Sequence, residues 1–530
     1  MTIATFACPD HPESTWRAPV HRLLGLVGQR QVTLDVLVAI GVLRYGLDKR
    51  IDQVQRILDR RGIHLSRGHL SRLGVEFLVR WHALFDRSRR HWAPRLRRGL
   101  ILLIDGTSDG GGPVTYRAIV ARTGVTVHAA TIASEKEGDL VAFLKEVKRE
   151  VGRPRLILRD GSPAARNACT RVFPGVPQAL CHWHFLRGAG EALLKAAYER
   201  LRTRILATKE LARLETLRKR LVEACASAAD PRRRSLRVAV RLQLEDVLSA
   251  RDATGGVPFH LAYFEVALAV RAARARFKGL VEAAYTWNVH EPLLLEAKQR
   301  LDALWDAKGV LETFLSVERR WDWFLRMRSW FRLEEAASGR PVEPDSETKA
   351  LDAATVASRM HSVRAEAEAA GAQEAAAWMR VVSRFAEHEA ELFPQVRLKN
   401  PPRTTSQLEY AHRGTRRRIR RRTGTLATRL EMERLGPHLA VWDNAFNAWF
   451  ARHALSGVDV VAAFLDQDAG VIEQGVAAVA ATRLRDRLPV KPRNRGVLLD
   501  EFAALVSGQA PVEVLTAWAD RVEGVTSPEV

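Results

Sequence analysis

Cysteine is scarce in this chain. Its 530 residues contain four cysteines, Cys8, Cys169, Cys181 and Cys225. They are too few and too far apart for a disulfide framework, which indicates a reducing compartment. We expect a bacterial cytoplasm, with the protein associated with the nucleoid, and the sequence leaves a nucleus open as the alternative.

Long apolar runs and acidic residues are also in short supply. No apolar run approaches the roughly 20 residues that a membrane-spanning helix needs, and residues 1–30 contain no hydrophobic segment of the signal-peptide type. Asp and Glu number 61 against 83 Lys and Arg, a net charge of +22. This excess favours a polyanionic partner, most often nucleic acid. The alternative is an arginine-rich composition that reflects only a GC-rich genome.

The N-terminal part of the chain has a helical pattern. Residues 1–30 contain three prolines and are expected to form an irregular arm. Residues 31–95 predict three helices, the last beginning after Ser66 as its N-cap and ending near Leu84. A glycine-containing turn before the last helix is typical of a helix-turn-helix, which binds DNA. Three side chains would then face the DNA: Arg67, His69 and Arg72. A plain helical bundle is the alternative.

Residues 96–187 change to a strand-rich pattern. Leu100–Ile104 is an unbroken apolar run, typical of a strand buried on both faces. The pattern then predicts a hairpin of two strands, a helix, a strand, a helix and a last strand, in the ranges 114–121, 125–132, 139–151, 156–158, 163–172 and 178–181. This order is that of an RNase H-like fold, a mixed sheet covered by helices.

The rest of the chain is helical in pattern. Residues 188–398 are rich in Ala, Leu, Glu and Arg and predict a large all-helical insertion domain. A basic helix within 399–425 would return to the core, and residues 426–530 would form a C-terminal helical region. The predicted fold class is therefore α/β, with an RNase H-like mixed-sheet catalytic core, an all-helical insertion and helical regions at both ends.

Two aspartates stand at the ends of the predicted buried strands. Asp105 follows Leu100–Ile104, Asp160 follows the strand at 156–158, and a glycine comes after each. If the two strands are neighbours, both carboxylates point into one cleft, and oxygen ligands of this kind suit Mg2+. Two such ions can activate the attacking oxygen and stabilise the leaving oxygen during phosphodiester cleavage. The alternative is a pair of unrelated Asp-Gly turns.

Four short motifs lie around and after the second aspartate: Asp160-Gly161-Ser162, Asn167-Ala168, Phe173-Pro174 and Leu180-Cys181-His182-Trp183-His184. They resemble the core of DDE transposases of the Mutator-like (MULE) and IS256-like group. The resemblance implies an enzyme that cuts transposon ends and joins the freed 3′-hydroxyl to target DNA. It also implies two Mg2+ ions, for which Mn2+ can substitute, and a long helical insertion between the second and third acids.

The resemblance also implies partners and supporting residues. The partners are double-stranded DNA, namely the terminal inverted repeats of the transposon and the target, and at least a second copy of the chain on DNA. Cys181 and His184, the most specific motif, would support the site without a metal. No zinc is expected, although the pair Cys8 and His11 leaves a shared zinc site as the alternative.

The third acid is expected to be Glu409, in a segment similar to that of the family. A helix from Ser406 would place Glu409 on one face with Arg413, Arg416 and Arg420. One alternative is that Ser406 and Glu409 form a capping box and bind no metal. The other is Glu191, which lies 31 residues after Asp160 and would make the core contiguous.

Two further clusters of side chains are expected to have different roles, one in DNA binding and one in the core. Residues 416–422 contain six arginines in seven positions, and we expect them to contact phosphates rather than form a merely solvated helix face. The predicted DNA contacts there are Arg413, Arg416, Arg417 and Arg420. Three tryptophans of the predicted insertion, Trp321, Trp323 and Trp330, indicate a packed helical core, with stacking on a flipped base as the alternative.

Two other classes of function remain open at this point. One is an RNase H-like, structure-selective nuclease that never joins DNA. The other is a DNA-binding regulator derived from a transposase and lacking catalysis, against which the presence of all three acids argues.

Overall fold

The computed structural model describes residues 5–8, 11–17, 32–97, 99–108, 113–227, 229–252, 256–331, 333, 352–394, 402–426 and 428–485. The chain forms two compact units, each with its own hydrophobic core. The first comprises Met1–Gln178 and Thr405–Val530, and the second Ala179–Thr404. Two expectations lie partly outside the described residues: the irregular arm at 18–30 and the C-terminal helical region after 485.

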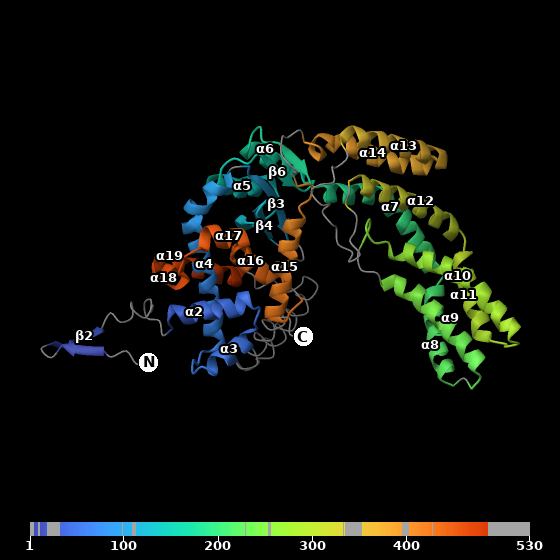
Figure 1. The fold of residues 1–530 in the computed structure, drawn as a ribbon, viewed down its shortest axis with the longest axis horizontal. Helices are drawn as coiled ribbons and strands as arrows, with labels where there is room; N and C mark the ends of the chain where they lie inside the picture. Colours follow the sequence, from blue (N-terminus) through green and yellow to red (C-terminus); the bar gives the residue numbers. More distant parts are fainter. Residues whose placement is uncertain are drawn as a thin grey trace, which may run out of the picture. The chain divides into compact units, whose positions relative to one another are not determined.

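A five-stranded mixed sheet forms the centre of the first unit (Figure 1). Its strands lie side by side in the order β5 (Thr126–Ile132), β4 (Val114–Val120), β3 (Ile101–Thr107), β6 (Leu156–Arg159) and β7 (Gln178–Leu180). Strand β4 runs antiparallel to β3 and to β5, and β6 runs parallel to β3. The C-terminal ends of β3, β5 and β6 therefore lie at the same end of the sheet.

Helices cover both faces of this sheet: α5 (Glu137–Val151) and α6 (Pro163–Val172) on one side, and α16 (Arg429–Trp442) on the other. All seven residues of β4 are buried in consequence. The ring of Tyr116 lies 5.0 Å from that of Phe143 in α5. Thr115 and Arg117 instead donate hydrogen bonds to main-chain carbonyls of α16, at 3.2 and 3.0 Å. Side chains of a strand alternate between faces, so odd positions of β4 face α16 and even positions face α5.

Segments from both ends of the chain share the core of this unit. Before the sheet come α2 (Leu34–Gly41), η1 (Val42–Gly46), α3 (Ile51–Asp59) and α4 (Arg67–Arg97); in the C-terminal part come α15 (Ser406–Thr423), α16, η3 (Asp443–Phe446), α17 (Ala448–Phe450), η4 (Ala451–Leu455), α18 (Val460–Leu465) and α19 (Ala469–Arg485). The ring of Trp442 packs on Phe77 and Trp81 of α4, with centroids 5.0 and 4.7 Å apart. Helices from both ends of the described part of the chain thus belong to one core with the sheet.

The structure corrects two expectations for the N-terminal part. β1 (Thr5–Cys8) and β2 (His11–Arg17) form an antiparallel pair, so the irregular arm is wrong for these residues. Proline is tolerated in an edge strand, which is why Pro12 did not prevent pairing. Helix α4 runs to Arg97 rather than to about Leu84, because its apolar face continues through the buried Phe85, Trp92 and Leu96.

The second unit is a helical assembly. Its helices are α7 (His182–Ala207), α8 (Glu210–Ala226), α9 (Pro231–Ser249), η2 (Ala250–Asp252), α10 (Ala262–Thr286), α11 (Pro292–Trp305), α12 (Val310–Trp330), α13 (Ala353–Ala370) and α14 (Ala372–Leu392). Trp323 and Trp330 are buried in its core, and the ring of Trp323 lies 5.9 Å from that of Trp378. The prediction of a packed core is therefore confirmed for these two tryptophans.

The mixed α/β class and the expected order of strands and helices between residues 100 and 181 are confirmed. One placement differs. Asp105 lies within β3 rather than after it, because β3 keeps pairing with β4 as far as Thr107 opposite Thr115. Among the described helices, none combines the length and the apolar character that spanning a bilayer requires.

Candidate active site

The register of the sheet places the two predicted aspartates at matching positions of neighbouring strands. β3 and β6 pair in parallel with Ile101 opposite Leu156 and Leu103 opposite Leu158. Continued by two residues, the same register sets Asp105 beside Asp160, which directly follows β6. Neighbouring strands lie about 4.8 Å apart. The structure thus puts both aspartates at one end of the sheet, as expected for a shared cleft.

Hydrogen bonds hold the segment of Asp160. Its carboxylate Oδ1 accepts from the main-chain N–H of Ser162 at 3.1 Å, and Ser162 caps α6 by accepting from Ala165 at 3.4 Å. The fully buried Arg159 donates to the Gln178 side chain at 2.7 Å and to the carbonyl of Asp160 at 2.8 Å. The carboxylate is therefore presented by a segment fixed to β6, to α6 and to Gln178.

Asp105 faces the side of the sheet that the C-terminal helices cover. It lies directly opposite Arg117 in the β3–β4 ladder, and side chains of directly opposed residues project to the same face. Arg117 donates to the carboxylate of Asp443 at 3.1 Å on that face. The acid expected from the C-terminal part can therefore approach Asp105 on this face.

Helix α15 packs on β3 and is tied to Asp105 by a histidine. His412 is buried and makes a hydrogen bond with the main chain of Asp105. Burial, with smaller contributions from the positive charges of Arg117 and Arg416, lowers the pKa of His412 to about 3. The imidazole is therefore neutral near pH 7, and sequence analysis had not singled it out.

Glu409 lies on α15 three positions before His412, and residues three apart share one face of a helix. Its side chain is 30% exposed, and its carboxylate lies 3.9 Å from the guanidinium of Arg413. α15 begins at Ser406 with Thr405 as its N-cap, without a side-chain capping bond. Glu409 is thus the fourth helical residue rather than the third, so the capping-box alternative does not describe this helix.

A further carboxylate, Glu135, reaches the same end of the sheet from the α5 side. Gly106 follows Asp105, and a Cβ atom added to it would lie 2.7 Å from Glu135 Oε1 and 2.7 Å from the Tyr116 ring. Burial raises the pKa of Glu135, and the negative charge of Asp160 raises it further. Sequence analysis missed this residue. The available signal was an acid shortly after a third strand, β5, which runs in the direction of β3 and β6.

Tyr116 is affected by these carboxylates together. Its side chain is buried, and its pKa lies well above the usual range because of burial and then of the charges of Asp160 and Asp105, with a smaller contribution from Glu135. Three carboxylates thus contribute to the electrostatic potential at one buried phenol. In the described ranges, however, no group of three or more His, Cys, Asp or Glu side chains has the spacing to hold a metal ion.

The arginines of α15 divide into two sets. Arg413, Arg417 and Arg420 are exposed and Arg416 is partly buried, so the four predicted DNA contacts lie at or near the surface. Two others serve the fold: Arg418 pairs with Asp443, and the buried Arg422 lies 4.7 Å above the ring of Tyr45. Internal pairing therefore accounts for part of the run, a role that neither the expected phosphate contacts nor the alternative of a solvated helix face includes.

The remaining predicted residues have these places. Arg67 and Arg72 are exposed at the start of α4, and His69 is partly buried there. Cys181 is buried at the N-cap of α7, and His184 is partly buried in its first turn, in the second unit. The rival acid Glu191 also belongs to the second unit, where it pairs with Arg187 at 3.3 Å.

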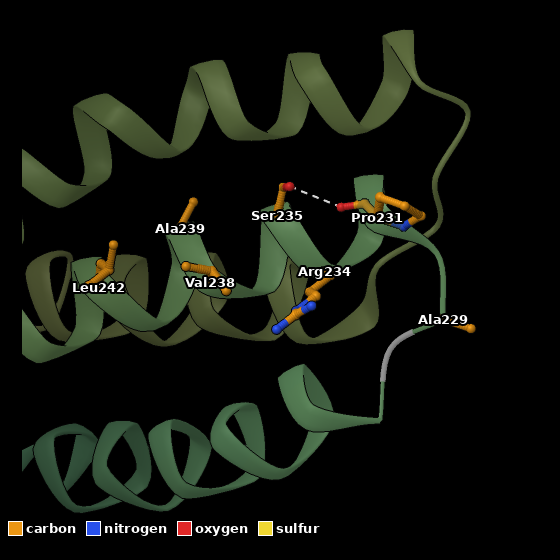
Figure 2. A pocket seen from close by; sticks show the side chains of 7 residues that line it. All are labelled: Ala229, Pro231, Arg234, Ser235, Val238, Ala239 and Leu242. Atoms are coloured by element: carbon orange, nitrogen blue, oxygen red, sulfur yellow. Dashed lines mark hydrogen bonds between the residues drawn. The ribbon is translucent and has the colours of Figure 1, made fainter.

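A hollow of about 540 Å³ lies far along the chain from these acids, over one side of α9 in the second unit (Figure 2). Its lining is mostly apolar, with Arg234 and Ser235 as the polar members, and it has no carboxylate. It does not resemble a site for cations.

Part of the chain matches a known protein family. Residues 119–187 match the MULE transposase domain, which confirms the resemblance inferred from the sequence motifs. The matched range contains Glu135, Asp160, Cys181 and His184, and it excludes Asp105 and Glu409. No curated protein matches the chain.

Proposed function

We propose that this chain is a DNA transposase that cleaves transposon ends and joins the freed 3′-hydroxyl to target DNA. The match of residues 119–187 with the MULE transposase domain indicates transposase function. The observation that carries the finer proposal is the level placement of Asp105 and Asp160, with α15 tied to Asp105 through His412. An RNase H-like core with the second unit as its helical insertion accords with the order of elements.

The proposed cofactor is a pair of Mg2+ ions, for which Mn2+ can substitute. The residues fit such ions chemically, because every candidate ligand is a carboxylate oxygen: Asp105, Asp160 and Glu409. When bound, two ions of this kind activate the attacking oxygen and stabilise the leaving oxygen.

The chain's own residues position the reacting groups. The peptide N–H of Gly106 donates to Asp105 Oδ1 at 2.9 Å, and that of Ser162 donates to Asp160. His412 holds α15 against β3 and so sets the direction in which Glu409 projects. Arg413, Arg416, Arg417 and Arg420 would contact the phosphates of the DNA, because they follow Glu409 along the same helix.

Glu135 supports the same proposal in a different role. Burial and the negative charge of Asp160 raise the pKa of Glu135, so this carboxyl keeps its proton to a higher pH than an ordinary glutamate does. A protonated carboxyl can donate a proton or a hydrogen bond where an ionised one cannot. We assign Glu135 the role of a proton donor or hydrogen-bond donor to an oxygen of the substrate phosphate, from the α5 side of the sheet.

The DNA partners follow from the reaction. Terminal inverted repeats and target DNA must be held together by at least two copies of the chain. Exposed Arg67 and Arg72 at the start of α4 are the proposed contacts of a helix-turn-helix formed by α3 and α4.

The test is nicking and joining of a plasmid that carries the DNA flanking this reading frame, with Mg2+ or Mn2+. Wild type is compared with Asp160→Asn, Glu409→Gln and Glu191→Gln. We expect activity to require metal, Asp160 and Glu409 and to survive loss of Glu191. If Glu191 is required and Glu409 is not, the assignment of the third acid is wrong.

The same assay separates the other two functions. A structure-selective nuclease would give nicked products and no joined ones. A DNA-binding regulator would bind the flanking DNA tightly, and wild type and Asp160→Asn would behave alike in every cleavage assay.

A further inference from the structure

One end of the second unit carries exposed aromatic and arginine side chains that do not pack into its core. Helix α9 begins there at Pro231, and α10 ends at Thr286, with a turn leading to α11. Arg233 donates to the carbonyl of His290 in that turn at 3.4 Å, which ties the first turn of α9 to the turn between α10 and α11. We call this end, formed by residues 230–237 and 285–291, the α9–α10 tip.

The tip exposes two aromatic side chains. Tyr285 is 89% exposed and Trp287 is 38% exposed. Large aromatic rings stabilise a fold mainly by burying area, so a ring left this exposed contributes little to the core. Arg237, by contrast, is partly buried here and donates to the buried Glu291 at 2.9 Å. The Arg237–Glu291 pair thus holds the tip in place from below, and the two outer aromatic rings are accessible to a ligand.

Positive charge accompanies these rings. Arg232 and Arg234 are exposed, and neither guanidinium forms an ion pair with any described residue. The nearest acid in sequence, Asp230, is occupied in capping α9 and accepts from the N–H of Arg232 at 3.0 Å. Glu291 is buried and is neutralised by Arg237 and Arg233, at 2.9 and 3.8 Å. Two exposed acids also lie at this end: Glu282, one turn before Thr286, and Glu223, next to Ala224, whose carbonyl accepts from Arg237 at 2.7 Å.

The hollow over α9 begins at the same tip. Figure 2 shows Arg234 and Ser235, which both line the hollow, in the first turns of α9, with Leu242 farther along the helix. Leu242 is 48% exposed. The hydroxyl of Ser235 donates a hydrogen bond to the carbonyl of Pro231 at 2.9 Å. Arg234 is the charged side chain that lines this hollow.

We propose that the α9–α10 tip binds unpaired DNA, with Tyr285 and Trp287 stacking on bases and Arg232 and Arg234 contacting phosphates. Positive charge combined with exposed aromatic rings is the means by which proteins hold single strands without reading their sequence. In the chain as a whole the excess of 83 Lys and Arg over 61 Asp and Glu favours a polyanion over an acidic or neutral surface. The inference rests on the proposed function in one respect, because strand cleavage and joining supply the unpaired nucleotides.

The experiment measures binding apart from catalysis. The full chain carrying Asp160→Asn is titrated into a fluorescein-labelled single-stranded oligonucleotide and, separately, into a duplex without ends of the element, with anisotropy as the readout. Trp287→Ala and Tyr285→Ala should each weaken single-strand binding about tenfold or more. Duplex binding should change much less.

Charge is tested by salt dependence. Arg232→Ala with Arg234→Ala should reduce the slope of log K against log salt by about 1.4, since each single-strand phosphate contact contributes about 0.7. Matched controls come from exposed residues elsewhere in the same unit: Leu311→Ala, which is 46% exposed, and Arg364→Ala, which is paired with Glu368. Neither control should alter binding. Thermal melting checks that all variants fold.

Unchanged single-strand binding in the aromatic and arginine variants would overturn the proposal. It would also be overturned if these variants changed only the association of the chain with itself, measured by sedimentation, because the tip would then be a protein interface. If wild type joins no DNA in the plasmid assay while single-strand binding still depends on the tip, this inference stands although the transposase proposal fails.

Discussion

His412 and Asp105 are joined by a hydrogen bond between a buried imidazole and the main chain of the central strand, although 307 positions separate them in the sequence. The bond ties α15 to β3 at the residue that carries the first proposed metal ligand. Because Glu409 lies on the same face of α15, the imidazole also determines where that carboxylate projects.

We expect His412→Leu to destabilise the first unit by about 1–3 kcal/mol, since it leaves a buried acceptor at Asp105 unsatisfied. DNA cleavage should fall more steeply than stability explains, and His412→Gln, which can still donate, should retain more of it. Urea unfolding and plasmid nicking measure the two effects. The exposed His64→Ala serves as the control. Equal cleavage by the Leu and Gln variants would contradict the positioning role.

Gly106→Ala should damage the site directly. The new Cβ would lie 2.7 Å from Glu135 Oε1, from the Tyr116 ring and from Val114, and overpacking of this kind costs about 1–3 kcal/mol. The matched control is Gly138→Ala in α5, where no atom lies within 4 Å and the helix should gain up to about 1 kcal/mol. Thermal melting of both variants, with nicking activity, checks the prediction. It fails if the two alanines behave alike.

Glu135→Gln should raise stability at neutral pH and lower activity. Burial and the charge of Asp160 raise the pKa of Glu135 in the folded protein. An acid with a raised folded pKa destabilises the fold once it ionises, so its cost appears as the pH rises through the folded pKa. The variant should therefore melt higher than wild type at pH 7.5 and equally at pH 4. Glu137→Gln, from a solvent-accessible carboxylate near Arg171, is the control.

Acid should weaken the first unit through a buried histidine pair. His82 and His438 contact each other through their Nδ1 atoms at 3.0 Å, and burial is the main cause that lowers their pKa values to about 4 and about 3. A histidine with a depressed folded pKa stabilises the fold above its unfolded pKa of about 6.5, and this contribution is lost as the pH falls below it. Urea unfolding between pH 7.5 and 5 should show the loss. His438→Leu should make the pH dependence shallower, and the exposed His91→Leu should not.

Two arginines of α15 should give opposite results. Arg417→Ala should leave melting unchanged and reduce the salt slope of duplex binding by about 0.9 for one lost phosphate contact. Arg422→Ala should destabilise the fold by about 3 kcal/mol, because it removes a buried cation from Tyr45 and from Glu431, 3.8 Å away. Melting curves and anisotropy titrations of the two variants are the measurement. Similar melting of both would contradict the division into surface and core arginines.

The sequence by itself determined the local elements of the core and the two aspartates. An apolar run at Leu100–Ile104 and a glycine after each aspartate are local signals, because strand burial and turn conformation depend on near neighbours. The same locality explains the errors. The end of α4 depends on the residues against which Phe85 and Trp92 pack, and the end of β3 depends on its pairing with β4. Both sets of partners lie outside the short stretch of sequence from which a helix or strand is predicted.

Only the tertiary structure decided which residues meet at the end of the sheet. No sequence motif includes Glu135, Tyr116 or His412. Their place at the site follows from interactions with Gly106 and Asp105, which depend on strand direction and register. The sequence also did not determine which arginines of α15 pair internally and which face outward. A helix places its side chains by its own period, but what covers each face is set by segments hundreds of residues away.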